Sequence, residues 1–243
     1  MMATQPIRRL NVSEPEFEAA FTRLLISPAE ADADLAQTVN EIVAGVAQEG
    51  DTALVRYTNE LDRRAVEDAQ ELRVSVDAIE QALSHVSPEV SSALTRAAAR
   101  IRAFHERQRA ESWQYEDEDG NLLGQRVSAL DCVGVYVPGG RASYPSSVLM
   151  NAMPAKVAGV ERVVMVAPAP GGEINPAVLA AAALAGVDEV FTVGGAQAVA
   201  ALAYGTATIP RVDKIVGPGN RFVAEAKRQV SGAWASIWSL APL

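Results

Sequence analysis

Helical periodicity dominates the first half of the chain. Between Asp34 and Glu49 the apolar side chains recur at intervals of three and four residues, so they form a single face of a helix. The pair Gly50-Asp51 ends that helix and starts the next. Ser75 and Ser87 are placed to cap two more. The predicted helices span residues 34–49, 52–61, 76–86 and 88 to about 111.

The pattern changes after Trp113. Short segments flank Asp119-Gly120-Asn121, which predicts a hairpin. From Asp131 onward, four short runs rich in β-branched residues alternate with helical segments. This alternation is typical of right-handed βαβ units and a parallel sheet buried on both faces. The predicted strands are 132–137, 162–167, 189–193 and 214–216, and the helices between and after them are 147–158, 176–185, 196–204 and 220–230.

These elements predict an α/β protein with a boundary near Ser128. A mainly helical region, residues 1–127, precedes a parallel-sheet domain, residues 128–231. We expect the helical region to be part of a domain that a missing C-terminal half completes. Residues 232–243 fit neither, because they hold two of the three tryptophans, no charge and no regular periodicity. Read one base earlier, their codons permit a glycine-rich stretch. We therefore hypothesise a frameshift near Ser231–Ala233 that replaces the continuation of a longer chain.

The composition argues against two classes of binding partner, nucleic acids and membranes. The formal net charge of −9 argues against nucleic-acid and anionic membrane surfaces, which require clustered lysine and arginine. No run of about 18 apolar residues is present to span a bilayer, and no secretory signal is visible. A single cysteine, Cys132, cannot form a disulfide within the chain. We expect a cytoplasmic protein that binds neither nucleic acid nor membrane.

Glycines follow three of the predicted strands, in Val137-Pro-Gly-Gly140, Val193-Gly-Gly-Ala-Gln197 and Val216-Gly-Pro-Gly-Asn220. Ligands of open α/β sheets collect at these strand ends, where helix N-termini carry partial positive charge. Each loop taken alone is an ordinary turn. Three such loops in one sheet favour a ligand of nucleotide size.

Three polar residues lie next to these loops: Tyr136, Gln197 and Asn220. A tyrosine at a strand end can stack on a ring and form a hydrogen bond through its hydroxyl group. Amides at helix starts can bind ribose or carboxamide groups. The alternatives are an ordinary N-cap for Asn220, which the spacing alone favours, and a surface helix residue for Gln197.

Catalytic and metal-binding patterns are missing from the sequence. The two histidines, His85 and His105, both lie in the helical region, and no spacing assembles three or four metal ligands. Cys132 opens an apolar strand and is typical of a buried small hydrophobe. No Ser/His/Asp arrangement is visible. We therefore assign no catalytic residue and no metal ligand.

Long motifs identify the chain as similar to the histidinol dehydrogenase family. They are Val133-Gly-Val-Tyr-Val-Pro-Gly-Gly-Arg-Ala-Ser-Tyr-Pro, Val193-Gly-Gly-Ala-Gln-Ala-Val-Ala-Ala-Leu-Ala-Tyr-Gly-Thr and Val212-Asp-Lys-Ile-Val-Gly-Pro-Gly-Asn-Arg. Gly50-Asp-Thr-Ala-Leu-Val-Arg-Tyr and Phe104-His-Glu-Arg-Gln match as well. The resemblance covers about residues 10–231.

The resemblance implies a zinc-dependent homodimer with incomplete, aldehyde-dehydrogenase-like Rossmann domains. Such an enzyme oxidises L-histidinol to L-histidine with two NAD+. The family's NAD-contacting tyrosine, glutamine and asparagine fall on Tyr136, Gln197 and Asn220. Its zinc ligands, its catalytic Glu–His pair and its substrate-contacting serine lie in a later part of the family's chain. We therefore expect this chain to be inactive as written. The alternative is a non-catalytic NAD-binding or interaction fragment.

Overall fold

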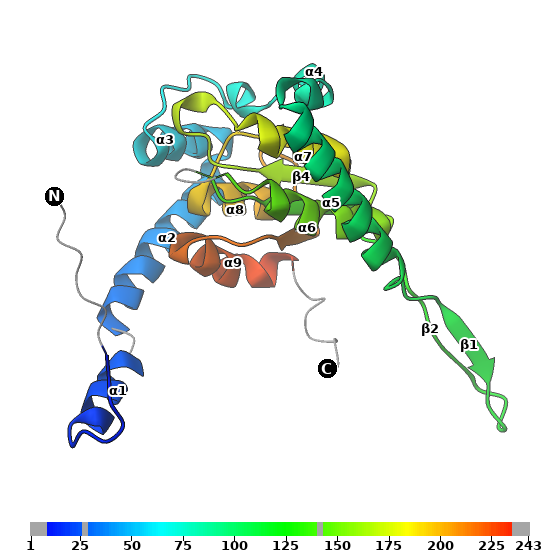
Figure 1. Ribbon diagram of the computed structural model, residues 1–243, viewed down its shortest axis with the longest axis horizontal. Helices are drawn as coiled ribbons and strands as arrows, with labels where there is room; N and C mark the ends of the chain where they lie inside the picture. Colours follow the sequence, from blue (N-terminus) through cyan, green and yellow to red (C-terminus); the bar gives the residue numbers. More distant parts are fainter. Residues whose placement is uncertain (1–8, 26–28, 140–142, 235–243) are drawn as a thin grey trace. The chain divides into compact units, whose positions relative to one another are not determined.

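The computed structural model describes residues 9–25, 29–139 and 143–234 (Figure 1). It contains two compact units, Met1–Gln37 and Thr38–Leu243, and the division between them falls within helix α2 (Ala29–Glu49). In the first unit, helix α1 (Phe17–Leu25) stacks the ring of Phe17 on that of Phe21, with 5.5 Å between ring centroids. Every feature described below belongs to the second unit.

Helices fill the second unit up to residue 106, as the sequence predicts. Ser75 and Ser87 cap their helices through side-chain oxygens that accept from Ala78 and Val90 N–H. The helix predicted over 76–86 is two short helices, and the long helix ends five residues earlier than predicted. The observed elements are α3 (Asp51–Asp62), η1 (Ala69–Leu72), α4 (Val76–Glu80), η2 (Ala82–His85) and α5 (Pro88–Glu106).

The predicted hairpin is confirmed. Strands β1 (Trp113–Glu116) and β2 (Leu122–Gln125) pair antiparallel on either side of the expected turn. The side chains of both strands are exposed.

A four-stranded parallel sheet forms the centre of the second unit and confirms the predicted fold class. The strand order is β5-β4-β3-β6. Strands β4 and β5 are added on one side of β3, and β6 pairs with the opposite side of β3. The strand order reverses beside β3, where open α/β sheets bind ligands. The strands are β3 (Cys132–Tyr136), β4 (Arg162–Val166), β5 (Glu189–Phe191) and β6 (Lys214–Val216).

The reversal of strand order puts helices on both faces of the sheet, because right-handed crossovers in opposite directions lie on opposite faces. Helices α6 and α7 contact each other and α5, while α8 and α9 contact each other (Figure 1). The sheet core packs tightly on α8: a Cβ at Gly134 would lie 3.0 Å from Leu202. These helices are α6 (Pro145–Val157), α7 (Pro176–Ala185), α8 (Gly195–Tyr204) and α9 (Arg221–Trp234).

The last helix differs from its prediction. It was expected to end at Val230, but α9 continues to Trp234 and so includes the first residues of the irregular tail. Residues 235–243 lie outside the described part, and the frameshift remains a hypothesis. The boundary near Ser128 also stays a prediction. No helix among the described residues is long and apolar enough to cross a bilayer.

Candidate functional site

A cavity of about 440 Å³ lies at the carboxyl edge of the sheet. Tyr136 ends β3, Gln197 belongs to the first turn of α8, and Asn220 precedes α9. All three predicted residues line this one cavity. The remaining lining residues come from the helical region and from the loops after the strands: Thr38, Ile42, Leu61, Asp62, Pro138, Gly139, Pro168, Pro170, Gly195, Ala196 and Phe222.

The tyrosine at the end of β3 is almost completely buried. Its hydroxyl oxygen accepts a hydrogen bond of 3.1 Å from the backbone N–H of Gly195. Burial raises the pKa of Tyr136, and the charge of Asp62 adds to this increase. The phenol therefore stays protonated, so its O–H group can donate to a ligand.

The glutamine of α8 is not a surface residue, and that alternative is wrong. Gln197 is fully buried, with 0 % of its surface exposed. Its side-chain oxygen Oε1 has no hydrogen-bond partner, and its Nε2 lies 3.5 Å from Oδ2 of Asp62, at the long limit of a hydrogen bond. A buried amide oxygen without a partner costs free energy. The side chain that carries this oxygen is among those that line the cavity.

Asp62 is the residue that the sequence does not reveal. It ends α3, far from the strand ends, and no spacing links it to the glycine loops. Its carboxylate accepts from the backbone N–H of Gly194, at the N-terminus of α8. Burial raises its pKa; the nearby charge of Arg64 and the bond from Gly194 oppose this effect. The guanidinium of Arg64 is itself held by the carbonyl and the hydroxyl of Thr192, both at 2.8 Å.

Asn220 is an exposed N-cap, the alternative that its spacing favours. Its Oδ1 accepts from the backbone N–H groups of Phe222 and Val223, at 3.0 and 3.1 Å. The cap uses the carbonyl end of the amide. The Nδ2 end is the one that can donate to a bound molecule.

The N-terminus of α8 is occupied by the protein's own atoms. Gly194 N–H donates to Asp62 and Gly195 N–H donates to Tyr136. The glycine at position 194 is also required by packing, because a Cβ there would lie 2.5 Å from the Cβ of Pro168. At this helix start, therefore, the expected approach of a ligand phosphate to free backbone N–H groups does not apply.

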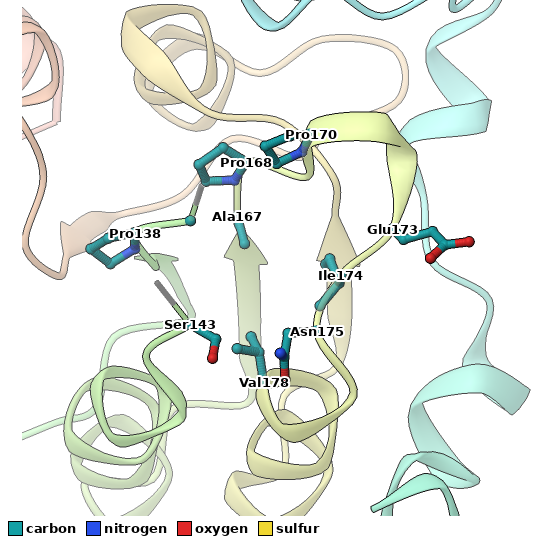
Figure 2. Close-up of a pocket in the computed structure, with 10 residues that line it drawn as sticks. Pro138, Ser143, Ala167, Pro168, Pro170, Glu173, Ile174, Asn175 and Val178 are labelled. Carbon is teal, nitrogen blue, oxygen red and sulfur yellow. The ribbon is translucent and has the colours of Figure 1, made fainter. Parts of the chain in front are cut away.

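A second cavity, of about 530 Å³, adjoins the first and shares Pro138, Gly139, Pro168 and Pro170 with it. Figure 2 shows Ser143 close to Val178 and Asn175, across from Pro168 and Pro170, while the carboxylate of Glu173 points away.

Asn175 uses its Oδ1 to cap α7, accepting from Ala177 N–H at 2.9 Å. The polar side chains that line this second cavity are exposed, so it lacks the buried polar atoms of the first.

The histidines and the cysteine lie away from the first cavity. His85 Nδ1 lies 2.9 Å from the carbonyl oxygen of Gln81, and His105 Nδ1 lies 2.6 Å from Oε1 of Gln108. Cys132 is half-buried, and burial raises the pKa of its thiol. Within the described ranges, no three His, Cys, Asp or Glu side chains are grouped to hold a metal ion.

Comparison with known proteins gives a consistent result. The family model of histidinol dehydrogenase matches residues 26–241, which include most of the irregular tail. Histidinol dehydrogenases from Aromatoleum aromaticum and Psychrobacter arcticus are 58 % and 57 % identical over 226 residues, 93 % of this chain and 52 % of each relative. The chain thus spans about half the length of these relatives.

A solved structure shares the fold. The crystal structure of histidinol dehydrogenase from Elizabethkingia anophelis superposes with a TM-score of 0.77 at 35 % identity. The superposition covers 82 % of this chain and 46 % of that one.

Proposed function

The chain belongs to the histidinol dehydrogenase family, and from this premise we propose that it forms the NAD+-binding side of an enzyme that oxidises L-histidinol to L-histidine. When bound, NAD+ accepts hydride from the substrate. The observation that carries the proposal is the convergence of Tyr136, Gln197 and Asn220 on one cavity.

The atoms of the cavity suit a nucleotide. The unpartnered Oε1 of Gln197 is a buried acceptor, and the protonated hydroxyl of Tyr136 is a donor. Apolar side chains of Ile42, Leu61 and Phe222 line the same space, and such walls suit a flat ring. We assign to these residues the binding and orientation of the dinucleotide.

The remaining family properties stay predictions for this chain. The described residues provide no zinc ligand set, so no step of the reaction is assigned to a metal here. The homodimer, the cytoplasmic location and the use of two NAD+ per turnover likewise rest on the resemblance and on composition.

Calorimetric titration of the purified chain with NAD+ tests the proposal. We expect saturable binding, and we expect Tyr136→Phe to weaken it several-fold because the donor hydroxyl is lost, at about 0.5–1.5 kcal/mol for one hydrogen bond. Tyr204→Phe is the matched control, since Tyr204 is exposed at the other end of α8. Absence of NAD+ binding, or equal loss in both variants, would reject the assignment.

A further inference from the structure

Two side chains that line the first cavity, the partly buried Asp62 and the fully buried Gln197, carry hydrogen-bond acceptors. The carboxylate of Asp62 and the Oε1 of Gln197 lie on adjacent side chains, with 3.5 Å between Asp62 Oδ2 and Gln197 Nε2. The hydroxyl of Tyr136 already accepts from Gly195, so it offers its proton. A ligand that matches this set must bring donors. Hydroxyl groups can do so, whereas phosphate oxygens only accept.

The carboxylate of Asp62 can accept more hydrogen bonds than the described residues donate to it. An ionised carboxylate offers about four lone-pair sites. Within the described residues, the protein supplies the N–H of Gly194 and the distant Nε2 of Gln197. The sites that remain match a vicinal diol, in which two neighbouring hydroxyl groups point in the same direction. The ribose of a nucleotide carries such a diol.

The charge of the cavity also favours a ribose diol over a phosphorylated ribose. Among the described residues that line the cavity, Asp62 is the charged side chain, and none of them is a lysine or an arginine. Arg64 lies near the carboxylate but directs its guanidinium to Thr192. A phosphate attached to the ribose would therefore meet the carboxylate of Asp62, while the guanidinium of Arg64 is held by Thr192 and does not line the cavity. Like charges in a partly buried site repel each other strongly.

We propose that Asp62, together with Gln197, binds the hydroxyl groups of the adenosine ribose and excludes a 2′-phosphate, so that this carboxylate makes the site select NAD+ over NADP+. The inference rests on the proposed function and adds a specificity-determining residue to it. We assign the adenosine half of the dinucleotide to this cavity because that half takes no part in hydride transfer. It requires only hydrogen-bonding side chains and apolar walls, and the cavity has both.

The test compares dissociation constants of NAD+ and NADP+ for the 243-residue chain and for Asp62→Asn, which keeps the size of the side chain. The wild type should bind NAD+ at least about tenfold more tightly than NADP+, the size expected for a charge-assisted contact. In Asp62→Asn we expect NAD+ to bind about tenfold more weakly and the preference to be lost. Glu60→Gln is the matched control, because Glu60 is exposed on the same helix and does not line the cavity.

A second measurement needs no variant. NAD+ that lacks the adenosine 2′-hydroxyl should bind the wild type about tenfold more weakly than NAD+ itself. If the wild type binds NAD+ but accepts NADP+ or the deoxy analogue equally well, or if Asp62→Asn keeps the wild-type preference, the role of Asp62 is overturned while the proposed function stands. If the wild type binds neither dinucleotide, both fail.

Discussion

The side chain of Gln197 carries a buried amide oxygen that lowers the stability of the fold, because it has no hydrogen-bond partner. A buried acceptor without a partner costs about 1–3 kcal/mol, and the Oε1 of this residue is such an atom. Methionine has a similar length and fills irregular space without a polar amide. We therefore expect Gln197→Met to be about 1 kcal/mol more stable than the wild type in urea unfolding, and to bind NAD+ more weakly.

The control for this variant is Gln114→Met, on the exposed strand β1, which should change neither quantity. A Gln197→Met protein that is less stable than the wild type would mean that the buried amide has partners within the fold.

Asp62 gives the stability of the protein a pH dependence with a definite sign. Burial raises its pKa in the folded state, so the folded protein takes up this proton at a higher pH than the unfolded chain does. Asp62 thus contributes stability that is fully present below its unfolded pKa and is lost as pH rises through its folded pKa. Between about pH 4 and pH 7, the wild type should lose stability relative to Asp62→Asn.

Thermal unfolding of both proteins across this pH range measures the difference. A constant gap in melting temperature, or one that changes in the opposite direction, would contradict the burial of this carboxylate.

At the residue scale, the sequence predicts the cavity only in part. Tyr136 and Asn220 were found because they stand at a strand end and a helix start, positions that a local pattern reveals. The burial of Gln197 and the presence of Asp62 were not predictable in this way. Both depend on the packing of α3 against α8, a contact between segments more than 130 residues apart.

At the element scale, the glycine after β6 is required by the backbone. Gly217 has φ +104°, and a Cβ there would lie 2.0 Å from the carbonyl oxygen of Tyr136. We expect Gly217→Ala to lower the free energy of unfolding by about 1–3 kcal/mol, since L-residues are strained in this conformation. We also expect this variant to distort the cavity, because the added Cβ would clash with the backbone of Tyr136, which lines it.

Gly232→Ala is the contrasting variant. This glycine lies within α9, and a Cβ would meet nothing within 4 Å. Alanine should therefore stabilise the helix by about 0.5–1 kcal/mol. Chemical denaturation of the two variants checks both signs, and a neutral Gly217→Ala would show that the loop can relax.

Element types were predicted better than element ends. The cap at Ser75 predicted one helix over 76–86, but the structure separates α4 from η2 at Gln81. Side chains explain the break: Ser84 Oγ and His85 Nδ1 both bond the carbonyl of Gln81, at 2.7 and 2.9 Å. Such local hydrogen bonds compete with the helix ladder, and periodicity does not register them.

At the scale of the molecule, the parallel sheet was predictable and the composition of the site was not. Alternating strands and helices predict the sheet, its buried faces and the edge at which ligands collect. The helical region was expected to belong to a separate domain that a later part of a longer chain completes. In the structure it also supplies lining residues to the cavity, among them Ile42 and Asp62. The dinucleotide site that we propose thus belongs to the whole unit 38–243, and not to the sheet domain alone.

Binding of NAD+ in the first cavity is tested most directly by a two-dimensional NMR titration of the ¹⁵N-labelled chain with NAD+. We expect saturable shifts at the amides of Gly195, Ala196 and Phe222, which line the cavity, while Trp113 and Gly124 of the hairpin stay unchanged. No shifts at high NAD+ concentration, or shifts confined to residues remote from the cavity, would contradict it.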